Sequence, residues 1–134
     1  MAALTDHAEN LLLNFLMTTG TATRPTNWFV CLYTSAPNDA STGSSGGTEV
    51  SGNGYSRQSV SWDTASGTGG TTANSGAVTF TASGGSFGTV THLAIADASS
   101  GGNLLWHGAM TTNKTVADGD SLQFAVGAID LTIA

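Results

Sequence analysis

Charged side chains are scarce in this chain of 134 residues: they make up 9% of it, against about 25% in ordinary soluble domains. Three residues are basic, and the formal net charge is −6. Arg24, Arg57 and Lys114 lie far apart in the sequence, so they do not form the basic cluster that phosphate binding requires. This distribution argues against a nucleic-acid partner.

Long apolar runs and cysteine pairs are lacking as well. The apolar stretch at residues 11–17 is interrupted by Asn14 and is much shorter than the roughly 20 residues of a membrane-spanning helix. No Lys or Arg precedes this stretch, which argues against a secretory signal peptide. Cys31 is the single cysteine, which excludes an intrachain disulfide and gives no information on the redox compartment. We therefore expect no membrane partner.

An amphipathic helix over residues 5–19 is the clearest pattern that is present. Its apolar side chains follow the spacing of one helical face, at Ala8, Leu11, Leu12, Phe15 and Leu16. Leu13 and Met17 widen this face beyond what a single neighbouring sheet needs. Two interpretations remain open. The face docks on the domain's own sheet, or part of it, including Leu12 and Phe15, contacts another subunit.

After Pro25 the apolar period changes from 3.6 to 2, which indicates strands. The segment WFVCLY, which begins at Trp28, is apolar on both faces, as in a strand covered above and below. In all, seven or eight short strands with turns between them predict one mainly β domain over 1–134. We expect an antiparallel β-sandwich or jelly-roll-like fold over about 26–134, with one N-terminal α-helix. The stretches 38–54 and 63–76 predict long, flexible loops.

The stretch GTEVSGNGYSRQSVSW contains an Asn-Gly pair between two strand-like segments. Asn-Gly is the strongest short-range signal for a β-hairpin, because both residues tolerate the positive φ of its turn. We therefore expect residues 47–50 and 55–62 to be antiparallel neighbours. In that arrangement Arg57 lies near Glu49 and can pair with it.

Arg57 and Tyr55 share one face of the expected hairpin, and three roles are open to them. The first, which we prefer, is structural: Arg57 and Glu49 fix the hairpin. The second is an intersubunit contact, because a planar guanidinium and a tyrosine both suit interfaces. Catalysis is a distant third.

The sequence predicts no catalytic set and no metal site. Residues 84–88 (GGSFG) match the G-x-S-x-G nucleophile motif, but that motif needs a helix after the serine, and a strand pattern follows here. His7, His92 and His107 lack the spacing of metal ligands. We therefore expect no enzyme activity and no cofactor.

Four segments carry a resemblance to a known family. They are WFVCLYTSAPND (28–39), GGTEVSGNGYSRQSV (46–60), FGTVTHLAIADASSGGNLLWHGAM (87–110) and NKTVADGDSLQF (113–124). In order and spacing they resemble small tailed-bacteriophage virion proteins, variously labelled tail-fibre-like, capsid decoration or structural. The resemblance implies a non-enzymatic structural protein of the virion.

Within this class we expect a capsid decoration or cement protein on the outer surface of the head. Its partners would be the major capsid protein and copies of itself, because low charge and a wide apolar helix suit a surface that packs against other subunits. The alternative is a tail-tip or tail-fibre component that contacts a host receptor or glycan. In that case Trp62 and Trp106 are the candidates for stacking on a sugar, although burial is the commoner fate in alternating strands.

Overall fold

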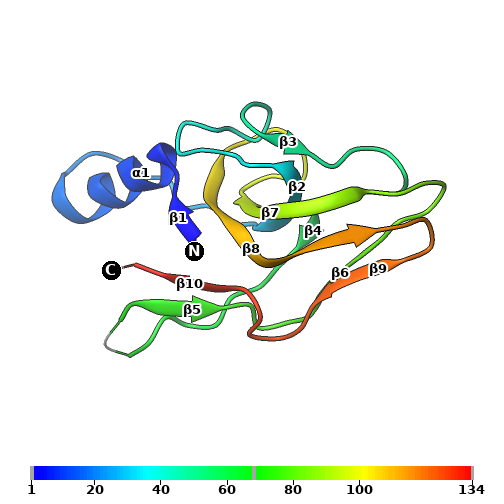
Figure 1. Cartoon of the computed structure of the whole chain (residues 1–134). Coiled ribbons are helices and arrows are strands. Elements are labelled where there is room, and N and C mark those ends of the chain that lie inside the picture. The colour runs from blue at the N-terminus through cyan, green and yellow to red at the C-terminus, as the bar shows by residue number, and fades with distance from the viewer. Residues whose placement is uncertain (1, 68, 134) are drawn as a thin grey trace.

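The computed structural model, which describes residues 2–67 and 69–133, contains one helix and ten strands in those ranges (Figure 1). Six strands form an antiparallel sheet: β1 (Ala2–Leu4), β2 (Phe29–Ser35), β3 (Thr48–Glu49), β4 (Gln58–Ser59), β7 (Gly88–Ala96) and β8 (Leu104–Val116). The order is β1-β8-β7-β2-β3, and β4 also pairs with β2. The long strands β7, β8 and β2 therefore lie at the centre of this sheet.

A second layer consists of two short ribbons, below the large sheet in Figure 1. β5 (Thr71–Ala73) pairs with β10 (Asp130–Thr132), and β6 (Val78–Thr81) pairs with β9 (Ser121–Phe124). The predicted mainly β, antiparallel class with one N-terminal helix is thus confirmed. The two-sheet sandwich or jelly roll is not confirmed, because the second layer is divided into separate ribbons.

The main hydrophobic core lies between the large sheet and the ribbons. Val30 and Leu32 of β2 meet Val78 and Phe80 of β6 and Leu122 of β9 in this cluster. A smaller cluster on the other face of the large sheet contains Cys31, Tyr33, Ala94, Ala96 and Leu104. Alternate residues of β2 therefore enter two different clusters, as the apolar pattern of both faces predicted.

The helix α1 (Asp6–Met17) forms where its 3.6-residue period predicts it. Thr5 caps it: the Thr5 hydroxyl accepts a hydrogen bond from the Ala8 N–H at 3.3 Å and donates to the Leu104 carbonyl at 2.5 Å. The N–H of Thr5 also donates to the Leu105 carbonyl, at 3.0 Å. The first turn of α1 is therefore fixed to β8.

Beyond its first turn α1 packs only partly on the sheet, because Leu11 and Leu12 are half-buried and the residues after them are exposed. Ala8 is its one buried residue, and four large apolar side chains are exposed: Leu13 (58%), Phe15 (69%), Leu16 (63%) and Met17 (76%). Docking of the whole apolar face on the domain's own sheet, the first of our two interpretations, is therefore wrong. Contact of this face with another subunit remains a prediction.

The two stretches predicted as long loops contain regular structure. β3 lies within residues 38–54, and β5 lies within 63–76. In the first stretch Ser41 is buried, and its hydroxyl accepts a hydrogen bond from the Asn38 N–H at 2.8 Å. Most of each stretch is loop, as predicted, and β3 lies in the segment 47–50 that was expected to pair; backbone pairing and buried polar contacts fix parts of both.

Candidate functional site

An Asn-Gly turn forms where the sequence predicted one. Asn53 and Gly54 both have positive φ, 53° and 78°, and the Tyr55 N–H donates to the Gly52 carbonyl at 2.9 Å. Among the residues that the structure describes, Asn53 is the one non-glycine residue with positive φ. Its side-chain amide donates to the Ser86 carbonyl at 2.7 Å, so the turn is fixed against a neighbouring loop.

The segments on either side of this turn do not pair with each other. β3 and β4 both pair antiparallel with β2, at different positions along the same edge. The hairpin predicted between residues 47–50 and 55–62 is therefore wrong. The chain follows the edge of β2, leaves it over residues 51–57 and then returns to it. The Asn-Gly pair predicts only the local turn. It carries no information about β2, the longer strand with which both segments pair.

Tyr55 fills the gap that the looped segment leaves along β2. Its hydroxyl accepts a hydrogen bond from the Leu32 N–H at 3.0 Å and donates to Glu49 Oε1 at 2.7 Å. Its ring stacks on Phe80, with centroids 6.0 Å apart, and meets the Phe87 ring edge-on at 5.8 Å. A side-chain hydroxyl thus satisfies a β2 amide that no neighbouring strand reaches.

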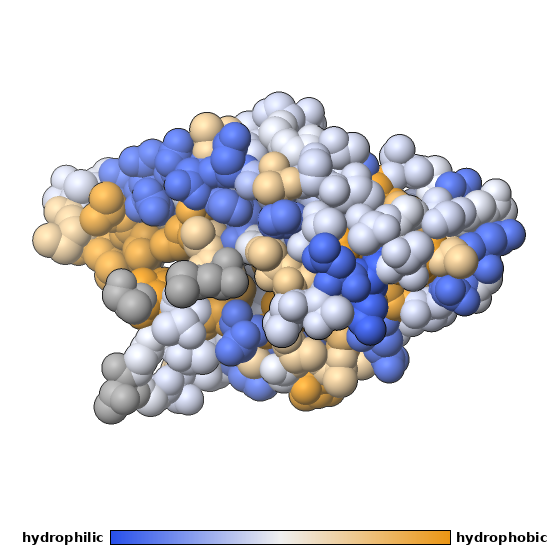
Figure 2. All heavy atoms as spheres, in the orientation of Figure 1, coloured by the Kyte–Doolittle hydropathy of each residue, from blue (hydrophilic) through white to orange (hydrophobic). Residues whose placement is uncertain are grey.

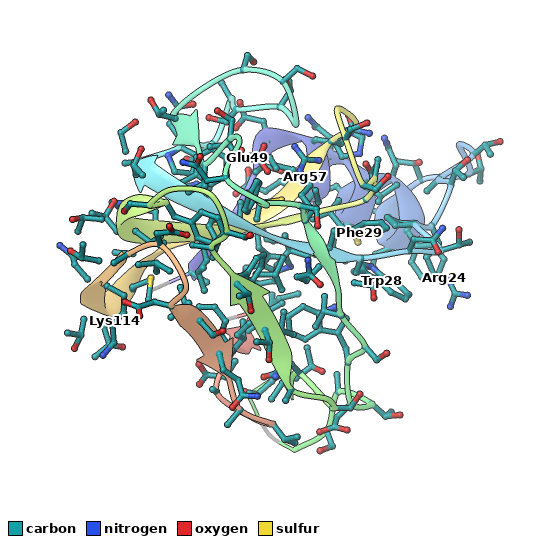
Figure 3. The ribbon with its side chains drawn as sticks, turned by 90° about the vertical axis from the view of Figure 1, so that its right-hand side faces the viewer. Arg24, Trp28, Phe29, Glu49, Arg57 and Lys114 are labelled. Carbon is teal, nitrogen blue, oxygen red and sulfur yellow. The ribbon has the colours of Figure 1, made fainter. Side chains whose placement is uncertain are left out.

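Arg57 is the centre of a hydrogen-bond network beside this gap. Its side chain is 4% exposed, and Nε and Nη2 each donate to the Glu49 carboxylate at 2.8 Å (Figure 3). Nη2 also donates to the Gly43 carbonyl at 2.7 Å, and Nη1 donates to the carbonyls of Ala98 and Gly101, both at 2.9 Å. These five bonds use all five N–H donors of a guanidinium. Arg57 therefore joins β3 to two loops that are distant in sequence.

The electrostatics of this centre keep Arg57 charged and the nearby thiol and phenol groups protonated. The hydrogen bonds that Arg57 donates to the Glu49 carboxylate raise the pKa of Arg57, against the opposing effect of burial. Burial raises the pKa of the Cys31 thiol from 9.0 to about 12, and it also raises the pKa values of Tyr33 and Tyr55. At neutral pH none of these thiol and phenol groups is a poised base or nucleophile. The arrangement is suited to holding loops together.

The other motifs that suggested chemistry have structural partners. The Ser86 hydroxyl of the GGSFG segment donates to the Val116 carbonyl at 2.7 Å, and β7 follows it in place of the helix that a nucleophile elbow needs. His107 Nε2 lies 2.7 Å from Asp39 Oδ1. Within residues 2–67 and 69–133, no three His, Cys, Asp or Glu side chains are grouped as a metal site. In the same ranges no helix has the length and apolar character to cross a membrane.

The exposed residues of α1, together with the space beneath the helix, form a second candidate site. We call Leu13, Phe15, Leu16 and Met17 the α1 surface; Figure 2 shows an apolar area over this part of the molecule. Beside it is an apolar groove of about 270 Å³ between α1 and β8, whose lining includes Leu12, Phe15, Trp28, Leu105 and Ile133. The six residues singled out from the sequence thus fall into two groups. Glu49, Tyr55 and Arg57 meet at the β2 edge, and Leu12, Phe15 and Trp28 line the groove.

Asn74 is an important residue that the sequence did not indicate. It is fully buried, and its amide donates to the carbonyls of Gly76 at 2.8 Å and Ala125 at 2.9 Å. Its Oδ1 accepts a hydrogen bond from the Ile129 N–H, also at 2.8 Å. Asn74 thereby joins the chain after β5 to the segments after β9 and before β10. Its one sequence signal is the position in an Asn-Ser-Gly turn, which is also common at exposed sites.

Comparison with known proteins identifies the family. A family model described as "Podophage GP4 fiber I protein gp80" matches residues 3–132. No curated protein matches the chain. The matched range includes α1, the Arg57 network, both layers except Ala2 of β1, and the groove except Ile133. The matched family agrees with the tailed-phage virion proteins that the four sequence segments resemble. The chain belongs to the podophage GP4 fiber I protein gp80 family.

Proposed function

We propose that this protein is a non-enzymatic subunit of the virion fibre that assembles through the α1 surface. Its family makes it a structural protein of a bacteriophage virion, and the description of that family names a fibre. The observation that carries the proposal is the exposed apolar face of α1 in a chain of this family. The family is consistent with the absence of catalysis that we expect.

The residues that the structure describes leave the α1 surface uncovered. Its four large apolar side chains are between 58% and 76% exposed on a single helix, beside an apolar groove. Contiguous exposed apolar patches of this kind mark interaction sites in soluble proteins. Burial of one such side chain stabilises an assembly by about 1.5–3 kcal/mol. A partner that covers the helix therefore gains substantial free energy.

We propose a second copy of this chain as that partner. The formal net charge of −6 makes two copies repel each other over most of their surfaces. The acidic residues of α1, Asp6 and Glu9, lie in its first turn, and the last turn carries no basic residue. The C-terminal half of the helix is thus an uncharged apolar region through which copies can approach. One helix supplies both protruding side chains and a groove wall, which suits contact between identical subunits.

The capsid decoration role expected from the sequence depends on the same low charge and the same apolar helix. Both features suit a fibre subunit equally well, so neither favours the head. The family description names a fibre, and this supports the tail-fibre alternative over a cement protein. We therefore propose neighbouring fibre subunits as partners, in place of the major capsid protein.

Solution assembly tests the proposed interface. We expect the purified protein to be oligomeric in light scattering coupled to size exclusion, and Leu16→Asp to produce monomers with an unchanged circular dichroism spectrum. Asn10→Asp is the matched control, because it adds the same charge to an exposed polar position of the same helix and should leave the oligomer intact. A wild-type protein that remains monomeric at all concentrations would contradict the interface.

The virion location needs its own test. An antibody raised against the protein and visualised with gold particles should label fibres on intact virions. Virions that lack the protein should keep sound heads and lose adsorption to the host. Labelling of the head, together with normal adsorption of virions that lack the protein, would place it on the capsid and reject the fibre role.

A further inference from the structure

We propose that the tryptophans of this chain form a binding pocket for a neutral saccharide. The sequence contains three tryptophans, and all of them, Trp28, Trp62 and Trp106, line one pocket of about 250 Å³. They come from separate parts of the chain: the residue before β2, the segment between β4 and β5, and β8. Each is half-buried, and Trp28 and Trp106 also line the α1 groove, whereas Trp62 lines this pocket and not the groove. This site goes beyond the assembly role proposed above.

Backbone pairing holds the segments that carry these rings, and the rings pack against the main hydrophobic core. Trp62 forms an antiparallel bridge with Asn74, and the next residue, Asp63, donates its N–H to the Ala73 carbonyl at 2.9 Å. The Trp28 carbonyl accepts a hydrogen bond from the Val60 N–H at 2.9 Å. Trp106 is held within the pairing of β8 with β7 and β1. Walls fixed in this way lose little conformational entropy when a ligand binds.

Two polar side chains accompany the rings at the pocket. Asp63 is exposed and lines the pocket, and in the described part of the chain no hydrogen bond or ion pair engages its carboxylate. Thr72 also lines the pocket, and its hydroxyl donates to the Asp63 carbonyl at 2.5 Å. The carboxylate oxygens of Asp63 and the free lone pairs of the Thr72 hydroxyl are therefore available as acceptors.

This combination matches the surface of a sugar. A sugar ring has an apolar C–H face that packs on a flat aromatic ring, and hydroxyl groups at its edge that donate to a carboxylate. Small-molecule sites are generally of this type, with mainly apolar walls and a few polar groups that set orientation. Tryptophan adds an N–H donor to its apolar surface. The volume of about 250 Å³ lies just below the range of about 300–1,000 Å³ typical of small-molecule sites, so it suits a single sugar unit at the end of a glycan.

Charge selects a neutral sugar over an acidic one. The pocket lining includes Asp63 and contains no Lys, Arg or His. The formal net charge of −6 adds to the repulsion of an anionic ligand. The carboxylate of a uronic or sialic acid would therefore find no basic side chain in the pocket and would be repelled by Asp63. A neutral saccharide is not repelled and needs no basic partner.

Calorimetric and tryptophan-fluorescence titrations test the pocket. The neutral probes are maltotriose, chitotriose and a rhamnose trisaccharide, and the charged probes are trigalacturonic acid and choline. We expect at least one neutral probe to bind with a Kd on the order of 1 mM or tighter, and the acidic sugar to bind more weakly. Choline is the probe for the competing cation site, because a carboxylate beside aromatic rings also attracts a quaternary ammonium group. Failure of all three neutral probes to bind, or tighter binding of choline or of the acidic sugar, would overturn the proposal.

Variants then locate the binding and separate it from assembly. Trp62→Ala should weaken binding of the neutral probe roughly tenfold, and Trp62→Phe should weaken it less, because a ring remains for stacking. Asp63→Asn should also weaken binding, whereas Glu9→Gln, which makes the same charge change on α1, should not. Trp62 and Asp63 line the pocket and not the α1 groove, so the oligomeric state should stay unchanged. Unchanged affinity in Trp62→Ala would reject the site.

Discussion

Replacement of Arg57 by alanine should destabilise the protein more than replacement of any other basic residue. The side chain is 4% exposed and donates five hydrogen bonds, two of them to a Glu49 carboxylate that is 23% exposed. Arg57→Ala leaves this carboxylate without its counter-charge and removes donors from the carbonyls of Gly43, Ala98 and Gly101. The loss affects β3 and both loops at once.

The expected destabilisation is about 3–4 kcal/mol. Removal of one partner of a buried ion pair costs about 3–5 kcal/mol, because the remaining charge stays buried and unpaired. Partial exposure of Glu49 lets water reach its carboxylate, which places the expected value in the lower part of that range. For a chain of this length the corresponding fall in Tm is about 10–14 °C.

Guanidinium denaturation and a thermal scan by circular dichroism measure this effect. Arg24→Ala is the matched control: Arg24 is exposed, and its loss should change the free energy of unfolding by less than about 0.5 kcal/mol. Arg57→Lys should recover only part of the stability, because an ammonium group cannot reproduce the planar fork. The double variant Arg57→Met with Glu49→Leu should be closer to wild type than Arg57→Ala, since no charge remains unpaired. If Arg57→Ala and Arg24→Ala proved equally mild, the structural role of the network would be refuted.

Three further predictions concern other buried groups. Asn74→Ala should lower the free energy of unfolding by about 2–4 kcal/mol, because it leaves the Ile129 N–H unpaired, whereas the exposed Asn113→Ala should have little effect in the same denaturation assay. Tyr55→Phe keeps the ring but removes the acceptor of the Leu32 N–H, and should cost about 1–3 kcal/mol by thermal denaturation; a loss below that of Asn113→Ala would contradict it. Burial raises the pKa of Cys31 from 9.0 to about 12, so the unfolded chain loses this proton first, and the stability contribution present below pH 9 should disappear as pH rises toward 12. Unfolding measured between pH 7 and 12 should show this decline, with a shallower slope for Cys31→Ala; identical slopes would refute the assignment.

The features that sequence reasoning predicted correctly are those that local patterns determine. The 3.6-residue period predicts α1, and the change to a period of 2 predicts the strands. The Asn53-Gly54 turn also forms, because its positive φ values depend on two adjacent residues. Arg57 does lie beside Glu49, but the hairpin from which this was predicted does not form; the two residues meet because β3 and β4 pair with the same edge of β2.

The features that could not be predicted depend on partners far away in the sequence. β3 and β4 pair with β2 instead of each other, because β2 offers one long edge to both. The carbonyl partners of Arg57 at Ala98 and Gly101 are 41 and 44 residues away. Asn74 resembles an ordinary turn residue until the fold brings Ala125 and Ile129 to it. The sequence also could not predict that the α1 surface is exposed, because an apolar stripe does not specify what covers it.

A reconstruction of the intact virion at side-chain resolution tests the central claim most directly. We predict that density for this chain lies in a fibre, and that Phe15, Leu16 and Met17 of each subunit are covered by a neighbouring copy. Density on the capsid surface, or fibre subunits in which the α1 surface remains exposed to solvent, would contradict the account.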